Sequence, residues 1–114
     1  MIEIICRDVD TAAILKVSGY IDAAIAPALH DALKRLRAEG RKRFIIDCKK
    51  LTYISSQGIW AILKHAMELR EMGGDICLAS VPECVQMVIS GLRIEGHLVT
   101  YSSAEEAAVS FFAA

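Results

Sequence analysis

The chain has 114 residues, close to the commonest size of one folded domain, so we expect a single domain over residues 1–114. Hydrophobic residues make up 54% and charged residues 24%, which supplies one ordinary core and excludes an intrinsically disordered chain. Thirteen Lys and Arg residues against fourteen Asp and Glu residues give a formal net charge of −1. This balance excludes a general attraction of the whole protein to nucleic acid or to an anionic membrane surface.

The chain has no apolar run of the ~18 residues that a membrane span requires, and residues 1–6 lack the features of a secretory signal. A cytoplasmic location without membrane insertion is therefore expected. The cysteines, Cys6, Cys48, Cys77 and Cys84, have neither paired spacing nor a nearby pair of histidines. We interpret them as core thiols in a reducing compartment, and we expect no metal site.

In chain order, short β-rich runs alternate with amphipathic helical stretches. Residues 2–7 and 13–18 predict two strands, joined by a hairpin turn at residues 8–11. A helix over residues 24–38 follows, with Asp22 as a candidate N-terminal cap. Its apolar positions fall on one face, at Ile25, Leu29, Leu33 and Leu36.

Residues 44–46 predict a central strand, because they show too little polar alternation for an edge. A helix over residues 56–71 comes next, and a strand over residues 76–78 follows it. Pro82 opens a short third helix. The buried stripe of the second helix is predicted to be Ile59, Ile62, Leu63, Ala66 and Met67.

Residues 97–100 predict a short last strand, and the final helix opens with a capping box formed by Ser103 and Glu106. The order of elements predicts one α/β domain, with a mixed, mostly parallel sheet of four to five strands covered by about four helices.

No catalytic constellation emerges from the motifs. Residues 91–96 have the glycine spacing of a phosphate-binding loop, but the Lys and Ser/Thr that must follow are missing. Residues 54–58 end like a nucleophile elbow without its first glycine. His30, His65 and His97 are scattered, and each is interpreted as a surface or cap-adjacent histidine. We therefore predict a protein that is not an enzyme.

Two adjacent serines at the start of the second helix form the most informative motif. Either Ser55 or Ser56 is expected to cap the helix, which is worth about 1 kcal/mol. The other hydroxyl, near Gly58, would then be free for modification. A phosphate there would be accepted by the positive end of the helix and would add a charge of about −1.5 to −2.

The whole chain resembles a STAS domain, the fold of bacterial anti-sigma-factor antagonists. The segments that carry the resemblance are Gly19–Asp22, Phe44–Leu51, Tyr53–Gly58, Gly73–Gly74, Pro82 and Gly91–Leu92. In the family the loop is similar to Asp-Ser-Ser/Thr-Gly, and the serine after the aspartate is phosphorylated. Aligned on Gly58, that serine is Ser56. Ser55 stands in place of the aspartate and Gln57 in place of the Ser/Thr.

The resemblance implies an anti-sigma-factor antagonist with Ser56 as phosphoacceptor and Ser55 as the alternative. Its partner would be an anti-sigma factor that is also a serine kinase, with a phosphatase as a further partner. The unmodified antagonist would bind this partner and release the sigma factor. ATP belongs to the kinase, so the domain itself would need no cofactor.

The predicted partner-binding residues surround this motif: Asp22, Ser55, Ser56, Gln57, Gly58 and Trp60. Asp22 is interpreted as a helix cap or, by resemblance, as a partner contact. Trp60 lies one position off the apolar stripe, so it is expected to be partly exposed. It is either an interface anchor or a side chain packed over a neighbouring loop.

Three other functions remain as alternatives. One is a constitutive STAS subunit of a transport ATPase or of another signalling complex, in which Ser56 only caps the helix. Another is a phosphoaspartate receiver domain, disfavoured because the chain begins with a hairpin and Asp47 is predicted inside a strand. The last is a small hydrolase built on Ser56 and a histidine.

Overall fold

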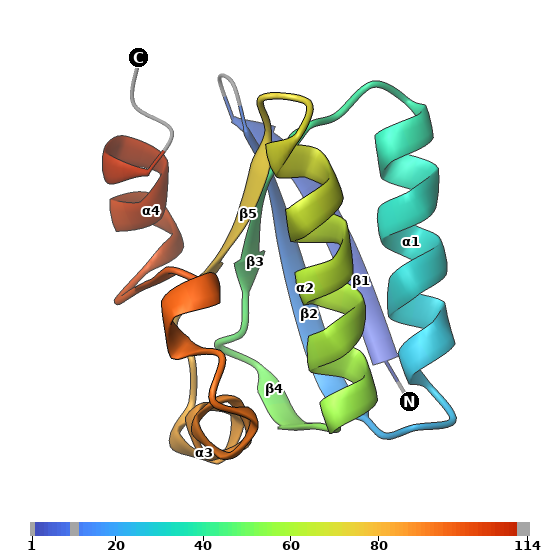
Figure 1. Ribbon diagram of the computed structural model, residues 1–114, viewed down its shortest axis with the longest axis vertical. Coiled ribbons are helices and arrows are strands. Elements are labelled where there is room, and N and C mark those ends of the chain that lie inside the picture. Colours follow the sequence, from blue (N-terminus) through green and yellow to red (C-terminus); the bar gives the residue numbers. More distant parts are fainter. Residues whose placement is uncertain (1, 10–11, 112–114) are drawn as a thin grey trace.

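The computed structural model describes residues 2–9 and 12–111, which fold into a mixed six-stranded sheet flanked by helices (Figure 1). The strands are β1 (Ile2–Val9), β2 (Ala12–Ile21), β3 (Arg43–Asp47), β4 (Leu51–Ile54), β5 (Asp75–Ala79) and β6 (Thr100–Tyr101). The helices are α1 (Ala26–Ala38), α2 (Ser56–Arg70), α3 (Glu83–Leu92) and α4 (Ala104–Ser110), with a 3₁₀ turn at Glu95–His97.

The sheet has the order β1-β2-β3-β5-β6, and β4 pairs with the end of β2. Strands β1 and β2 are antiparallel, and every other pair is parallel. This confirms the predicted mixed, mostly parallel sheet with four helices. Asp10 and Thr11 of the predicted hairpin turn lie outside the described residues.

The helices form two layers of unequal size. The helices α1, α2 and α3 cover one face of the sheet, and α4 covers the other (Figure 1). Because side chains alternate along a strand, Phe44 and Ile46 enter the large core whereas Ile45 packs toward α4. All three are buried, so β3 is the central strand that its apolar sequence predicts.

The sequence prediction missed β4 and misplaced β6. The pairing of β2 with β4 changes register between Gly19 and Tyr20, and the Thr52 hydroxyl donates to the Gly19 carbonyl at 3.0 Å. Such a short, irregular strand is defined by its distant partner and not by its own pattern. At the other end, residues 97–100 are not one strand, because a 3₁₀ turn extends to His97 and the strand begins at Thr100.

Asp47 also differs from its prediction, because it is the last residue of β3 and not an interior position. Its Oδ1 accepts a hydrogen bond from the backbone N–H of Lys49 at 3.0 Å. The position of this aspartate therefore does not argue against a receiver domain. The antiparallel pairing of β1 with β2 does, as the hairpin predicted.

The helix ends agree with the predictions only in part. The regular part of α1 begins at Ala26 rather than residue 24, and its N-cap is Ile25, which makes no side-chain capping bond, so Asp22 is not the predicted N-cap. Asp22 instead stabilises the turn before the helix, where its Oδ1 accepts from the Ile25 N–H at 3.0 Å. At α4, Ser103 Oγ accepts from the Glu106 N–H at 3.0 Å. The capping box is only half formed, because the Glu106 carboxylate instead accepts from the Ser102 hydroxyl at 2.6 Å.

The prediction that the cysteines are core thiols is confirmed for some of them and not for others. Cys48 and Cys77 are buried, which raises the pKa of each to about 12, and Cys6 is half-buried. Cys84 is exposed on α3, so the prediction of a core thiol is wrong there. Among the described residues, no helix is long and apolar enough to cross a membrane.

Two histidines that looked isolated in the sequence meet between α1 and α2. His65 is only 3% exposed, and it replaces Met67, which is 56% exposed, in the buried stripe of α2. His65 Nε2 lies 2.9 Å from His30 Nδ1, and His65 Nδ1 lies 2.8 Å from Arg37 Nη1. Arg37 also donates to Glu68 Oε1 at 2.7 Å. The interpretation of scattered surface histidines is therefore wrong for His30 and His65, because helix packing joins positions 35 residues apart, whereas His97 is exposed as expected.

The surroundings of His65 favour its neutral form. Burial is the largest cause, followed by the nearby His30 and the cationic Arg37, and together they lower the pKa of His65 from 6.5 to about 4. An unfolded chain protonates this histidine near pH 6.5, whereas the folded chain does so only near pH 4. The folded state is therefore penalised as the pH falls through this interval.

We predict that the free energy of unfolding contains a contribution from His65 that is fully present above pH 6.5 and is lost between pH 6.5 and pH 4. The slope due to this one proton is at most about 1.4 kcal/mol per pH unit. Urea unfolding across this range, compared with His65→Gln, measures it. The same pH slope in both proteins would contradict the prediction.

Candidate functional site

The start of α2 is joined to the end of β2. Ile21 and Ile54 are register partners at the carboxyl ends of β2 and β4, and the Ser55 N–H donates to the Ile21 carbonyl at 2.7 Å. Asp22 is the next residue after β2. The turn that begins at Asp22 and the first turn of α2 therefore lie at the same edge of the sheet, which brings together the predicted site residues of two separate segments.

The two serines have different environments. Ser55 is the N-cap of α2, is 5% exposed, and accepts from the Gly58 N–H at 3.3 Å. Ser56 is the first helical residue and is half-buried, and its Oγ donates to Gln57 Oε1 at 3.3 Å. Ser55 thus performs the capping that the sequence required of one of them, and the Ser56 hydroxyl has no part in it.

Gly58 allows α2 to approach the two strand ends closely. A Cβ at this position would lie 2.7 Å from Ile54 Cγ1 and 3.2 Å from Ile21 Cγ2. Both isoleucines are buried, so neither can move without disturbing the core. The glycine therefore sets the distance of the first turn of α2 from the sheet, and with it the position of Ser56.

Three aromatic side chains close to this turn along the chain are exposed, but they do not share one face. Trp60 is 47% exposed on α2, as its position off the apolar stripe predicts. Tyr20 and Tyr53 are also exposed, and their rings stack with centroids 4.9 Å apart. Ile21 and Ile54 face the core beneath α2, so alternation along the strands directs Tyr20 and Tyr53 to the opposite face of the sheet. Sequence reasoning missed the tyrosines. A signal was present, because each precedes the isoleucine that ends its strand, in β2 and in β4.

The described residues around the start of α2 include few groups that could catalyse a reaction or bind a metal ion. The Asp22 carboxylate already accepts from the Ile25 N–H in the turn before α1. The only two close histidines among the described residues, His30 and His65, bond to each other and not to a serine. Within the same part of the chain, no group of three or more His, Cys, Asp and Glu residues could hold a metal ion. The arrangement offers a serine hydroxyl that does not cap the helix, one exposed tryptophan and a helix N-terminus.

Comparisons with known proteins identify a family and a relative. The family model described as the STAS domain matches residues 3–107. The protein BtrV of Bordetella bronchiseptica, named as an anti-sigma factor antagonist, is 30% identical over 106 residues, which cover 90% of this chain and 89% of that protein.

Solved structures share the fold at lower sequence identity. An anti-sigma factor antagonist from Mycobacterium paratuberculosis is 21% identical with a TM-score of 0.86, covering 96% of this chain and 93% of that one. The antagonist SpoIIAA in its unphosphorylated form is 16% identical with a TM-score of 0.81 and 96% coverage of both chains. The phosphorylated form of SpoIIAA, from Bacillus, is 15% identical with a TM-score of 0.71, covering 93% of this chain and 96% of that one.

Because only Ser55 caps the helix, replacing Ser55 or Ser56 by alanine should change the stability of the fold by different amounts. Ser55→Ala should lower the free energy of unfolding by about 1 kcal/mol, because the Gly58 N–H loses its acceptor. Ser56→Ala should change it by less than about 0.5 kcal/mol, because this residue is only half-buried and its hydroxyl does not cap the helix. Urea unfolding of both variants measures the difference, and equal losses would contradict the assignment of the cap.

The close approach at Gly58 predicts that a larger side chain at this position destabilises the fold. Gly58→Ala should lower the free energy of unfolding by about 1 kcal/mol, because crowding against Ile54 and Ile21 outweighs the better helix propensity of alanine. Gly91→Ala in α3 is the matched control, since a Cβ there has no atom within 4 Å. The control should be neutral or stabilising. Stabilisation by both substitutions in the same thermal unfolding assay would contradict the close approach.

Proposed function

This chain belongs to the STAS domain family, and from that premise we propose that it is an anti-sigma factor antagonist whose binding is switched off by phosphorylation of Ser56. The proposed partner is an anti-sigma factor that is also a serine kinase, and a phosphatase would restore the unmodified state. The protein would act by binding in the cytoplasm, without catalysing a reaction of its own. The similarity to named antagonists supports the pathway.

The observation that carries the proposal is the separation of roles between Ser55 and Ser56. Ser55 is buried and caps the helix, so the fold does not depend on the Ser56 hydroxyl. Ser56 is only half-buried, at the first position of α2, and is therefore more exposed than Ser55. A phosphate on it would lie at the end of the helix where N–H groups lack intrahelical partners and the dipole favours negative charge. Modification would thus change the surface and leave the fold intact.

The contact surface for the partner is proposed to surround Ser56. Gln57 and Trp60 extend it along the exposed side of α2, and Asp22 borders it from the end of β2. Large exposed aromatic side chains are enriched among the residues that dominate binding energy. A dianion at the centre of such a surface would cost several kcal/mol through desolvation and repulsion from like charges.

We predict that a kinase-like ATPase is captured from a lysate of the source organism by the wild-type protein and by Ser56→Ala, and that Ser56→Glu binds it more than tenfold more weakly. The captured protein, incubated with the wild-type chain and Mg-ATP, should place one phosphate on Ser56. Mass spectrometry locates the phosphate, and Ser56→Ala should remain unmodified.

Ser110→Glu is the matched control, because Ser110 is exposed on α4, which covers the opposite face of the sheet, and the substitution adds the same charge away from the site. This variant should bind like the wild type. Equal capture by the wild type, Ser56→Ala and Ser56→Glu would reject the switch and favour a constitutive STAS subunit.

A further inference from the structure

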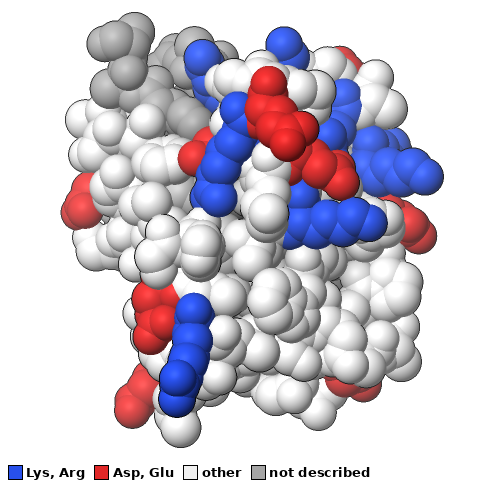
Figure 2. Space-filling view, in the orientation of Figure 1, with Lys and Arg blue, Asp and Glu red and all other residues white. Residues whose placement is uncertain are grey.

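The carboxyl-terminal halves of α1 and α2 enclose a hollow of about 580 Å³ together with the loop that leads into β3. This volume lies in the range of small-molecule sites. Figure 2 shows Lys and Arg side chains gathered over this end of the molecule, with acidic side chains among them. The hollow lies at the far end of α2 from Ser56, and the proposed switch does not use it.

In the wall of the hollow, Arg37, His65 and His30 form a chain of hydrogen bonds in which each residue donates to the next. Arg37 can only donate, so His65 Nδ1 accepts from it and the proton of neutral His65 is on Nε2. His65 Nε2 then donates to His30 Nδ1, 2.9 Å away. The proton of a neutral His30 is consequently on Nε2, whose N–H has no acceptor in this chain of bonds. His65 is buried, so Arg37 and His30 are its hydrogen-bond partners, and these two bonds leave the His30 Nε2–H as a donor.

Three lysines on this hollow form no ion pair with a described residue, although Lys64 is close enough to Glu68 to interact with it electrostatically. These lysines are Lys34, Lys42 and Lys64. The one carboxylate in the wall, that of Glu68, already accepts from Arg37 at 2.7 Å. The wall therefore presents mostly donors and positive charge, and its single acidic group is occupied.

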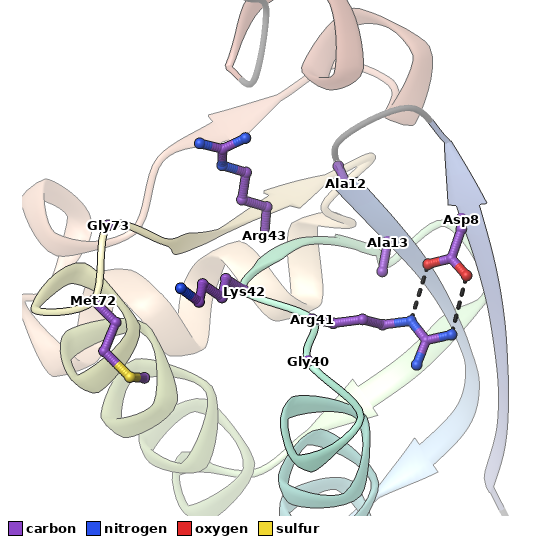
Figure 3. Close-up of a pocket in the computed structure, with 9 residues that line it drawn as sticks. All are labelled: Asp8, Ala12, Ala13, Gly40, Arg41, Lys42, Arg43, Met72 and Gly73. Atoms are coloured by element: carbon purple, nitrogen blue, oxygen red, sulfur yellow. Dashed lines mark hydrogen bonds and ion pairs between the residues drawn. The ribbon is translucent and has the colours of Figure 1, made fainter.

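Arg41 differs from these lysines because its charge is satisfied inside the protein. Its guanidinium donates to both carboxylate oxygens of Asp8, at 2.9 and 3.0 Å, and also pairs with Glu39. Figure 3 shows Arg41 turned toward Asp8, whereas Lys42 points the other way, toward Met72. Lys42 thus stays available to the hollow between the helices.

We propose that this hollow binds a small, multiply charged phosphate compound, with Lys34, Lys42 and Lys64 contacting its oxygens and His30 donating through Nε2. A phosphate ligand offers acceptors only, which matches a wall of donors. Several lysines around one concave surface repel one another, and a ligand with more than one negative charge relieves this repulsion. The attraction of helix carboxyl-terminal ends for cations explains Arg35 and Arg37 in the last turn of α1 but not Lys64 in the middle of α2.

Inorganic pyrophosphate is the probe, titrated into the full chain at a fixed ionic strength of ~0.15 M and followed by calorimetry and by the imidazole NMR signals of His30 and His65. Saturable binding that shifts the His30 signals is the expected result. The Lys34→Gln/Lys64→Gln variant should bind at least tenfold more weakly. Both lysines are exposed, so its thermal unfolding should match that of the wild type.

The matched control is Lys49→Gln/Lys50→Gln, which removes the same charge from exposed positions outside the hollow. It should bind pyrophosphate like the wild type. Absence of saturable binding by the wild type, or equal weakening in both double variants, would overturn the proposal. Titration with a nucleoside diphosphate then distinguishes two kinds of ligand. Tighter binding than that of pyrophosphate would show that the ligand is a larger molecule that carries the phosphate groups, and weaker binding would show that it is the free anion.

Discussion

The pairing of β4 with the end of β2 fixes where α2 begins, and most features of the surface follow from that point. The 2.7 Å bond from the Ser55 N–H to the Ile21 carbonyl holds the first turn of α2 at the edge of the sheet. From there α2 runs beside α1 across one face (Figure 1). His65, nine residues after Ser56, then meets His30, and the last turns of α2 border the basic hollow. A shift in the start of α2 would change both ends together.

Local patterns predicted the parts of this fold that depend on neighbouring residues. The apolar run of β3 indicated a strand buried on both faces, and the spacing of Leu29, Leu33 and Leu36 indicated the buried side of α1. The serine pair indicated a helix start with one hydroxyl in excess of the capping requirement, and the structure identifies Ser55 as the cap. These features hold because a cap, a helix face and a central strand are each defined within a few residues.

Contacts between distant segments were not predictable in the same way. β4 has four residues and an irregular register, so only its partner β2 defines it as a strand. Nothing in the spacing of His30 and His65 indicates a hydrogen bond, because their contact depends on how α1 and α2 pack. Met67 shows the converse: its apolar side chain fits the helical stripe, but α2 is turned so that the buried position is filled by His65. The polar pair in the helix interface follows from this rotation.

Charges at the two ends of α2 interact only weakly in solution, because salt screens them from each other. Nine residues of helix place Ser56 about 13 Å from His65 along the helix axis, which exceeds the screening length of about 8 Å at physiological ionic strength. A charge added at Ser56 would therefore change the potential around the first turn of α2 and have little effect on the lysines near its other end. Because the two sites share a rigid helix but not a common electrostatic field, occupation of one would influence the other only if it moved the helix. Gly58 and the bond from Ser55 to Ile21 oppose such a movement by fixing the first turn against buried side chains.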